Sequence, residues 1–271
     1  MKFLKNLFQF YIYSNVHVSL SVACFVLVTG HLFDYLLYNE ALFLSCATFF
    51  AYHFIRYLNK EKYGKKHLLD TFSNQYKGVI FGMVVMATIV CVVEVFSFKI
   101  AQVLRLLPFG ILTLMYAFSF LKLNGIRYSI RYIPGLKIVV IALVWAGVIV
   151  FFPLEFRTDT LLYFLEMMLF VIVLTLPFDI RDMVFDIQKI KTFPLMMGLP
   201  KVRVLGGFFL LISIAIHYQI FNTVGLWQYV VTSSCLMVLL LLSSEHQSRY
   251  FASFWVEGIP ILYYLLISFF S

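Results

Sequence analysis

Residues 177–198 read PFDIRDMVFDIQKIKTFPLMMG, and they directly follow an apolar run at residues 161–176 that is long enough, with its flanks, to cross a bilayer. Three carboxylates stand at the end of this run: Asp179, Asp182 and Asp186. Their spacing of i, i+3 and i+7 predicts one shared face of an α-helix, because side chains three, four or seven residues apart project in nearly the same direction. Charged side chains at membrane depth are usually functional or paired, so this segment is the first place to look for a site.

The composition indicates a protein embedded in a membrane. Hydrophobic residues make up 62% of the sequence and charged residues 13%, whereas ordinary soluble domains have about 45–50% apolar and about 25% charged residues. Apolar segments of about 20 residues recur, and each is long enough to span a bilayer as a helix. An outer-membrane barrel would instead have alternating strands of about ten residues. We predict a single all-α polytopic domain over residues 1–271, with about nine transmembrane helices near residues 13–33, 40–58, 78–97, 102–121, 136–153, 160–178, 204–221, 225–243 and 252–270.

The positions of the basic residues predict the orientation in the membrane. The chain has 21 Lys and Arg residues, and all but Lys99, Arg105 and Arg157 fall in segments on the same side as the N-terminus. The positive-inside rule therefore predicts a cytoplasmic N-terminus, an outside C-terminus and a cytoplasmic site at residues 179–186. This alternation explains the net charge of +8 without a nucleic-acid partner. We expect no cleavable signal peptide, and a multi-pass protein of the cell (inner) membrane, with an organelle membrane as the alternative.

The clustered carboxylates predict a metal site. Mg²⁺ is a hard cation that typically binds one or two carboxylates, water and substrate phosphates. The alternative is a solvated helix end, in which the three acids pair with Arg181, Lys189 and Lys191.

The same segment resembles the second aspartate motif of the UbiA family of intramembrane aromatic prenyltransferases. That motif is D-x-x-D-x-x-x-D, commonly followed by a Thr and a Gly; here Asp179, Asp182 and Asp186 match and are followed by Thr192 and Gly198. The resemblance implies a UbiA-like helical bundle, a prenyl diphosphate substrate and a Mg²⁺ cofactor. It also implies that Asp182 and Asp186 are catalytic metal ligands, and that Asp179 is a third ligand or an orienting group.

The chain departs from the family at the first aspartate motif, N-D-x-x-D-x-x-x-D, which lies at the cytoplasmic end of the second span. This chain reads AYHFIRYLNKEKYGKKHLLD at residues 51–70, and His53, Arg56 and Lys60 occupy the acidic positions. No shift in register restores the acids. We therefore expect one metal site to be lost, with a guanidinium or ammonium contacting the diphosphate directly, since Arg matches phosphate geometry.

These basic residues have other interpretations. One alternative is that the chain has lost diphosphate chemistry altogether. Another is that the basic residues only determine topology or attract anionic lipids. For His53, the alternative is an interfacial or buried histidine with a satisfied hydrogen bond.

Four further polar residues are candidates for the diphosphate site. Asn15 lies at the cytoplasmic end of the first span, where capping of the helix start is the alternative role. Lys122 and Arg131 lie between the fourth and fifth predicted spans, and Lys137 lies at the start of the fifth. The resemblance implies that basic residues in that segment help to hold diphosphate, although any cytoplasmic loop would be basic.

Some intramembrane polar residues lie away from the predicted site. Glu94 and Glu166 fall within the third and sixth spans, toward the outer half. An intramembrane carboxylate favours a functional role by default. His217 and Glu257 stand alone in the sequence, and we predict no role for them.

Together these features and the resemblance predict transfer of a prenyl group from a prenyl diphosphate to an aromatic or other lipid-soluble acceptor within the bilayer. Mg²⁺ on Asp182 and Asp186 would assist ionisation, and Phe and Tyr faces would shield the carbocation. The alternative is a catalytically inactive lipid-binding or assembly factor on the same scaffold. A secondary transporter fits only loosely.

Overall fold

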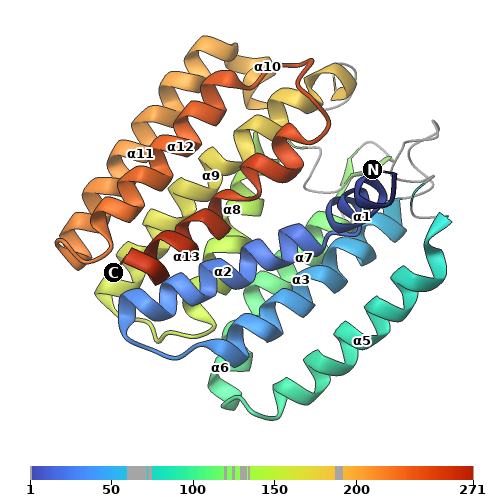
Figure 1. Ribbon diagram of the computed structural model, residues 1–271, viewed down its shortest axis with the longest axis horizontal. Helices are drawn as coiled ribbons and strands as arrows, with labels where there is room; N and C mark the ends of the chain where they lie inside the picture. The colour runs from blue at the N-terminus through green and yellow to red at the C-terminus, as the bar shows by residue number, and fades with distance from the viewer. Residues whose placement is uncertain are drawn as a thin grey trace.

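The computed structural model describes residues 2–59, 72, 75–118, 121–123, 126–128, 133, 135–186 and 192–270. These residues form a bundle of long helices with one two-stranded antiparallel hairpin (Figure 1). In chain order the elements are α1 (Lys2–Tyr13), α2 (Val16–Phe33), α3 (Tyr38–Asn59), α5 (Lys77–Val95), α6 (Ile100–Arg105), α7 (Leu107–Ala117), β1 (Leu121–Leu123), β2 (Ile126–Tyr128), α8 (Leu136–Phe151), α9 (Thr158–Asp186), α10 (Phe193–Met197), α11 (Leu199–Phe221), α12 (Leu226–Leu242), the π-helix η2 (Phe251–Val256) and α13 (Ile259–Phe270).

Each predicted span coincides with an apolar helical segment, so the predicted all-α membrane fold is confirmed. Among the described residues, seven helices are long and apolar enough to cross a membrane. The other two segments, α8 and α12, are apolar but shorter, with 16 and 17 residues. At about 1.5 Å per residue, α8 reaches only about 24 Å. This is shorter than the hydrocarbon core of a typical bilayer, about 30 Å.

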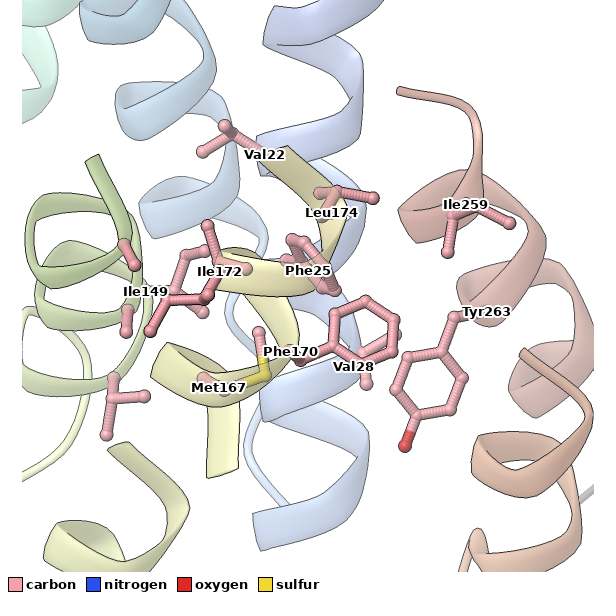
Figure 2. Packing of buried hydrophobic residues seen from close by; sticks show 14 of the residues in the cluster. Val22, Phe25, Val28, Ile149, Met167, Phe170, Ile172, Leu174, Ile259 and Tyr263 are labelled. Atoms are coloured by element: carbon pink, nitrogen blue, oxygen red, sulfur yellow. The ribbon is translucent and has the colours of Figure 1, made fainter. Parts of the chain in front are cut away.

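The helix α9 is the central element of the bundle. It packs along α8 on one side and α11 on the other (Figure 1). Its residues Met167 and Phe170 are fully buried, as expected for a helix that is apolar all round. Figure 2 shows the Phe170 ring between α2 and α13, close to Phe25 and Tyr263. The ring centroids of Phe25 and Phe170 lie 5.9 Å apart in an edge-on arrangement.

Small residues let neighbouring helices approach closely, which is typical of helix packing in membranes. A Cβ atom on Gly147 of α8 would overlap the ring of Phe109 in α7. A Cβ atom on Gly206 of α11 would likewise overlap Leu240 of α12. These two glycines therefore set the spacing of two helix pairs.

The helix α5 lies at the edge of the bundle and exposes apolar side chains. Only Ile80 and Ala87 of α5 are buried, whereas Phe81 and Met86 are 67% and 61% exposed. An apolar surface of this kind indicates a membrane-facing helix rather than a water-facing one. It supports the assignment of the chain as a membrane protein.

The N-terminal helix α1 was not predicted from the sequence. It is seen nearly end-on in Figure 1, whereas α2, α3 and α9 are seen from the side, so it runs across the end of the bundle. Its Phe8 ring packs edge-on against Tyr250 and Phe254, with centroids 5.2 and 5.1 Å apart. Gln9 Nε2 donates to the Tyr250 hydroxyl at 3.1 Å. These contacts hold α1 against η2.

Candidate active site

Two of the three predicted aspartates meet a lysine from another helix. Lys137 stands in the first turn of α8, and its Nζ lies 2.8 Å from Asp179 Oδ1 and 3.5 Å from Asp182 Oδ2. The side chains of Lys137 and Asp179 are 11% and 3% exposed, whereas that of Asp182 is 27% exposed. Because both carboxylates reach one ammonium group, Asp179 and Asp182 share a face of α9, as predicted. Asp186 is the last residue of α9, and its side chain lies outside the described part of the chain.

The end of α9 that carries these acids is tied to the rest of the bundle. Pro177 lies inside the helix, where it cannot donate an intrahelical hydrogen bond. The carbonyl of Pro177 accepts a hydrogen bond from Gln247 Nε2 at 3.0 Å. Gln247 belongs to the segment between α12 and η2, so this bond positions the acidic end of α9 against the C-terminal part of the chain.

Arg181 supplies a second cation beside the acids. Its Nε donates to Asp182 Oδ1 at 3.0 Å, and its Nη1 donates to Ser253 Oγ in η2 at 3.3 Å. Its guanidinium carbon lies 5.2 Å from the centre of the Phe178 ring, within the range of a cation–π contact. The alternative that the acids pair with neighbouring basic residues is thus observed for Asp182 and Arg181. Lys189 and Lys191 lie outside the described residues.

Aromatic and acidic side chains from other segments lie in the neighbourhood of this charged group. Tyr116 of α7 lies within electrostatic range of Lys137. It also lies within range of Tyr52 in α3, whose hydroxyl neighbours the Trp145 indole of α8. Glu257, which follows η2 directly, lies within electrostatic range of Tyr52 and of Arg181. Five segments of the chain therefore converge here.

Sequence reasoning missed most of these neighbours. No role was predicted for Glu257, yet the structure places it beside the candidate site. Its position as an isolated carboxylate in an apolar segment was the signal that could have identified it. Tyr52 takes the Asn position of the first aspartate motif, but no role was predicted for it. Tyr116 carried no spacing signal, because its proximity depends on how α7 packs.

Asn15, His53 and Arg56, which were predicted as substrate-binding residues, form one hydrogen-bonded group. Arg56 Nη2 donates to Asn15 Oδ1 at 3.0 Å, and Arg56 Nη1 donates to the Tyr13 carbonyl at 3.1 Å. His53 Nε2 lies 3.0 Å from the Ser14 carbonyl oxygen and 3.4 Å from Asn15 Nδ2. The group therefore holds the turn between α1 and α2.

Asn15 has an unusual backbone conformation at this turn. It occupies the N-cap position of α2 with φ 62°, in the left-handed region, and its side chain makes no capping hydrogen bond. Instead, its amide contacts His53 and Arg56. The capping role considered for the Asn15 side chain is therefore not observed, while the alternative of a hydrogen-bonded histidine is observed for His53.

The remaining predicted diphosphate ligands fall on parts of the chain that the structure leaves out. Lys60 and Arg131 lie outside the described residues. Lys122 is in strand β1, where it pairs with Arg127 in the hairpin register, and its side chain is not described. Their roles stay predictions.

The chemistry of the donor set fits a divalent cation in part. Among the described side chains, no group of three or more His, Cys, Asp or Glu residues is arranged to hold a metal ion. Asp182 is partly exposed, and Asp186 follows about one helical turn later. Mg²⁺ can use one or two carboxylates together with substrate phosphates, so the roles of Asp182 and Asp186 as metal ligands stay predictions. Asp179 differs in distance and burial: it is 3% exposed and lies 2.8 Å from the Lys137 ammonium, whereas Asp182 is 27% exposed and lies 3.5 Å from it.

A second buried polar pair lies between α9 and α11. Glu166 Oε1 lies 2.9 Å from His217 Nδ1, and both side chains are fully buried. His217 Nε2 lies 3.2 Å from the Val224 carbonyl oxygen. The imidazole stacks on the Tyr229 ring, with centroids 4.5 Å apart. His217 was predicted to have no role, and its partner on a distant helix could not be read from sequence spacing.

Comparison with known proteins identifies the fold. No protein-family model and no curated protein matches this chain. Two solved structures match it over nearly its whole length. A UbiA homolog from Archaeoglobus fulgidus bound to GPP and Mg²⁺ has a TM-score of 0.59, and a UbiA homolog from the same organism bound to DMAPP and Mg²⁺ has a TM-score of 0.57. In both comparisons the identity is 11%, and the match covers 96% of this chain and 99% of the other.

The chain is therefore a helical-bundle membrane protein with the fold of UbiA homologs. The UbiA-like helical bundle implied by the aspartate motif is confirmed by this similarity. At 11% identity the similarity concerns the fold, and the activity of this chain is argued separately below.

Proposed function

We propose that this chain transfers a prenyl group from a prenyl diphosphate to a lipid-soluble, aromatic acceptor within the membrane. The observation that carries the proposal is the meeting of Asp179 and Asp182, from the D-x-x-D-x-x-x-D segment, with Lys137 at the end of a UbiA-like bundle. The similarity to homologs bound to GPP or DMAPP with Mg²⁺ supports the substrate class and the metal.

The chemistry follows from the charges at the site. The allylic C–O bond would break heterolytically, with its electron pair leaving on a diphosphate oxygen, and the carbocation would be attacked by the acceptor, which then loses a proton. When bound, Mg²⁺ would neutralise the diphosphate as a leaving group, held by Asp182 and Asp186. Lys137 and Arg181 would add fixed positive charge on the protein side.

Other residues would complete substrate binding. Tyr52, Tyr116 and Trp145 bring aromatic rings to the same region, and aromatic faces stabilise cations through their quadrupole. The predicted diphosphate contacts from the rest of the basic face are Asn15, His53, Arg56, Lys60, Lys122 and Arg131. For Arg56 and His53, binding the substrate would add to their observed role in the α1–α2 turn.

The proposed setting is the cell (inner) membrane with the site facing the cytoplasm. The distribution of Lys and Arg residues between the predicted spans supports a cytoplasmic N-terminus and an outside C-terminus. Helix α1 and the end of α13 lie at opposite ends of the bundle (Figure 1), which agrees with termini on opposite sides. Reporter fusions at the two termini would test this orientation.

A second candidate function is a lipid-binding or assembly factor that keeps the scaffold without catalysis. One observation favours it. His53 and Arg56 stand at two acidic positions of the first aspartate motif, and both bind the α1–α2 turn. These two positions therefore offer no carboxylate to a second metal ion.

Release of diphosphate would separate the two functions. The purified protein would be incubated with a panel of prenyl diphosphates and membrane extract as the source of acceptors, with Mg²⁺ or with EDTA. We expect diphosphate release that requires Mg²⁺ and is lost in Asp182→Ala. The matched control is Asp159→Asn in the first turn of the same helix, whose exposed pair with Arg157 should matter little.

Two outcomes would contradict the proposed activity. Release that is equal in Asp182→Ala and in the unmodified protein would remove the aspartates from the mechanism. A protein that neither releases diphosphate nor binds any prenyl diphosphate would favour the non-catalytic factor.

A further inference from the structure

Lys137 stands where the aspartate face of α9 would otherwise attract a metal ion. Its ammonium lies between two carboxylates, 2.8 Å from Asp179 and 3.5 Å from Asp182. The Lys137 residue as a whole is 8% exposed and Asp179 is 2% exposed. A buried pair at this distance is a charge-assisted hydrogen bond rather than a loose surface contact.

The position of Lys137 in its own helix indicates that the carboxylates hold it there. Gly135 is the N-cap of α8, with φ 71°, and Lys137 is the second helical residue. A positive charge at a helix N-terminus is disfavoured by the helix dipole. The lysine therefore gains nothing from its own helix at this position, and its favourable partners are the acids of α9.

The charges of Asp179 and Asp182 are balanced by protein groups. Asp179 has Lys137, and Asp182 has Arg181 on one oxygen and Lys137 near the other. A Mg²⁺ ion binds carboxylate oxygen at about 2.1 Å. On the oxygen of Asp179 that contacts Lys137, the ion would come within about 5 Å of the ammonium, where two positive charges repel strongly in a buried site.

We infer that the Lys137 ammonium replaces a metal ion at Asp179, so that Asp179 is the counter-ion of this lysine and not a metal ligand. The inference rests on the proposed function and deepens it. Lys137 then supplies positive charge at the diphosphate site that a second divalent ion would otherwise supply. Fewer divalent ions are therefore needed when Lys137 is present.

Counting bound Mn²⁺ tests this inference without relying on catalysis. Mn²⁺ serves as the probe ion, measured by electron paramagnetic resonance on the full-length protein in detergent, with and without inorganic diphosphate. The variant Lys137→Met/Asp179→Asn removes both charges of the pair and leaves side chains of similar size. We expect it to bind as many Mn²⁺ ions as the unmodified protein, whereas Asp182→Asn should bind fewer.

The single variant Lys137→Met gives the opposite expectation. It removes the ammonium from the Asp179 carboxylate, so we expect Mn²⁺ binding to increase by about one ion per chain, and the increase to disappear when Asp179→Asn is added. A loss of Mn²⁺ in the double variant relative to the unmodified protein would overturn the inference, because Asp179 would then be a ligand. Unchanged Mn²⁺ binding in Lys137→Met would overturn it as well.

Failure of the proposed function would look different. The unmodified protein would then bind neither diphosphate nor Mn²⁺, while Lys137→Met would still create an Asp179-dependent Mn²⁺ site if the inference is correct. Circular dichroism and size-exclusion profiles of each variant would show that the comparison is made between folded proteins.

Discussion

Oε1 of Glu166 in α9 lies 2.9 Å from Nδ1 of His217 in α11, and neither side chain is exposed. This pair connects the central helix to one of its two main neighbours. It is distinct from the charged group at Asp179. A carboxylate and an imidazole buried among apolar helices must satisfy each other, since an unpaired polar group there is costly.

Breaking this pair should destabilise the protein. We expect His217→Phe to lower the free energy of unfolding by about 1–3 kcal/mol, because it leaves a buried carboxylate oxygen without its partner. Thermal unfolding in detergent would measure the loss. Glu166→Leu/His217→Phe should lose less than the sum of the two single variants, since contacting residues are not additive. Strict additivity would show that the pair contributes little.

The close packing of α7 and α8 makes a second prediction. We expect Gly147→Ala to destabilise the protein by about 1–3 kcal/mol, the usual range for overpacking, because the added methyl group would overlap Phe109. The control is Gly82→Ala in α5, where a Cβ atom meets nothing within 4 Å. That control should be neutral or slightly stabilising, because Ala is the better helix former. Equal effects of the two substitutions on thermal unfolding would contradict the packing of α7 on α8.

Arg56 should hold the N-terminal helix in place. Hydrogen bonds to charged groups contribute about 1.5–3 kcal/mol each, and Arg56 donates to Tyr13 and Asn15. We expect Arg56→Ala to increase hydrogen–deuterium exchange in α1 by about tenfold or more. Lys5→Ala, at an exposed position of the same helix, is the control.

The same variant separates the two roles considered for Arg56. If Arg56 only supports the α1–α2 turn, the KM for prenyl diphosphate should change little in Arg56→Ala. A large rise in KM with unchanged protection of α1 would instead assign Arg56 to the substrate.

Arg181 is half-buried, with its side chain 30% exposed, and it should matter for the proposed reaction. It contacts both Asp182 and Ser253, so its loss would free a carboxylate oxygen of the site and disconnect α9 from η2. We expect Arg181→Ala to lower kcat/KM for the prenyl diphosphate by about tenfold to a hundredfold, the equivalent of about 1.5–3 kcal/mol.

Two related variants test the geometry of Arg181. Arg181→Lys keeps the charge but not the two-armed contact, so it should restore only part of the activity. Ser253→Ala removes the weaker of the two bonds and should have the smaller effect. A Ser253→Ala variant as impaired as Arg181→Ala would indicate that the link to η2, and not the contact with Asp182, is the important one.

Several features of this protein followed from local sequence alone. Long apolar segments identified the helices, because a chain in a bilayer must satisfy its own backbone hydrogen bonds and has few other solutions. The i, i+3 and i+7 spacing placed Asp179 and Asp182 on one face of α9, because helical geometry is a local property. The UbiA-like fold, implied by that motif, agrees with the solved structures.

Other features depended on the tertiary structure. Lys137 is 42 residues from Asp179 in the numbering, and Glu166 is 51 residues from His217; only the packing of α8, α9 and α11 brings these partners together. Arg56 looked like a substrate ligand by its position in the motif, but its observed partners lie on the turn before α2. The sequence by itself determined which segments are helices and which faces carry charge. Which charge neutralises which was decided by tertiary packing, since electrostatic pairing depends on distance in space and on exclusion of water.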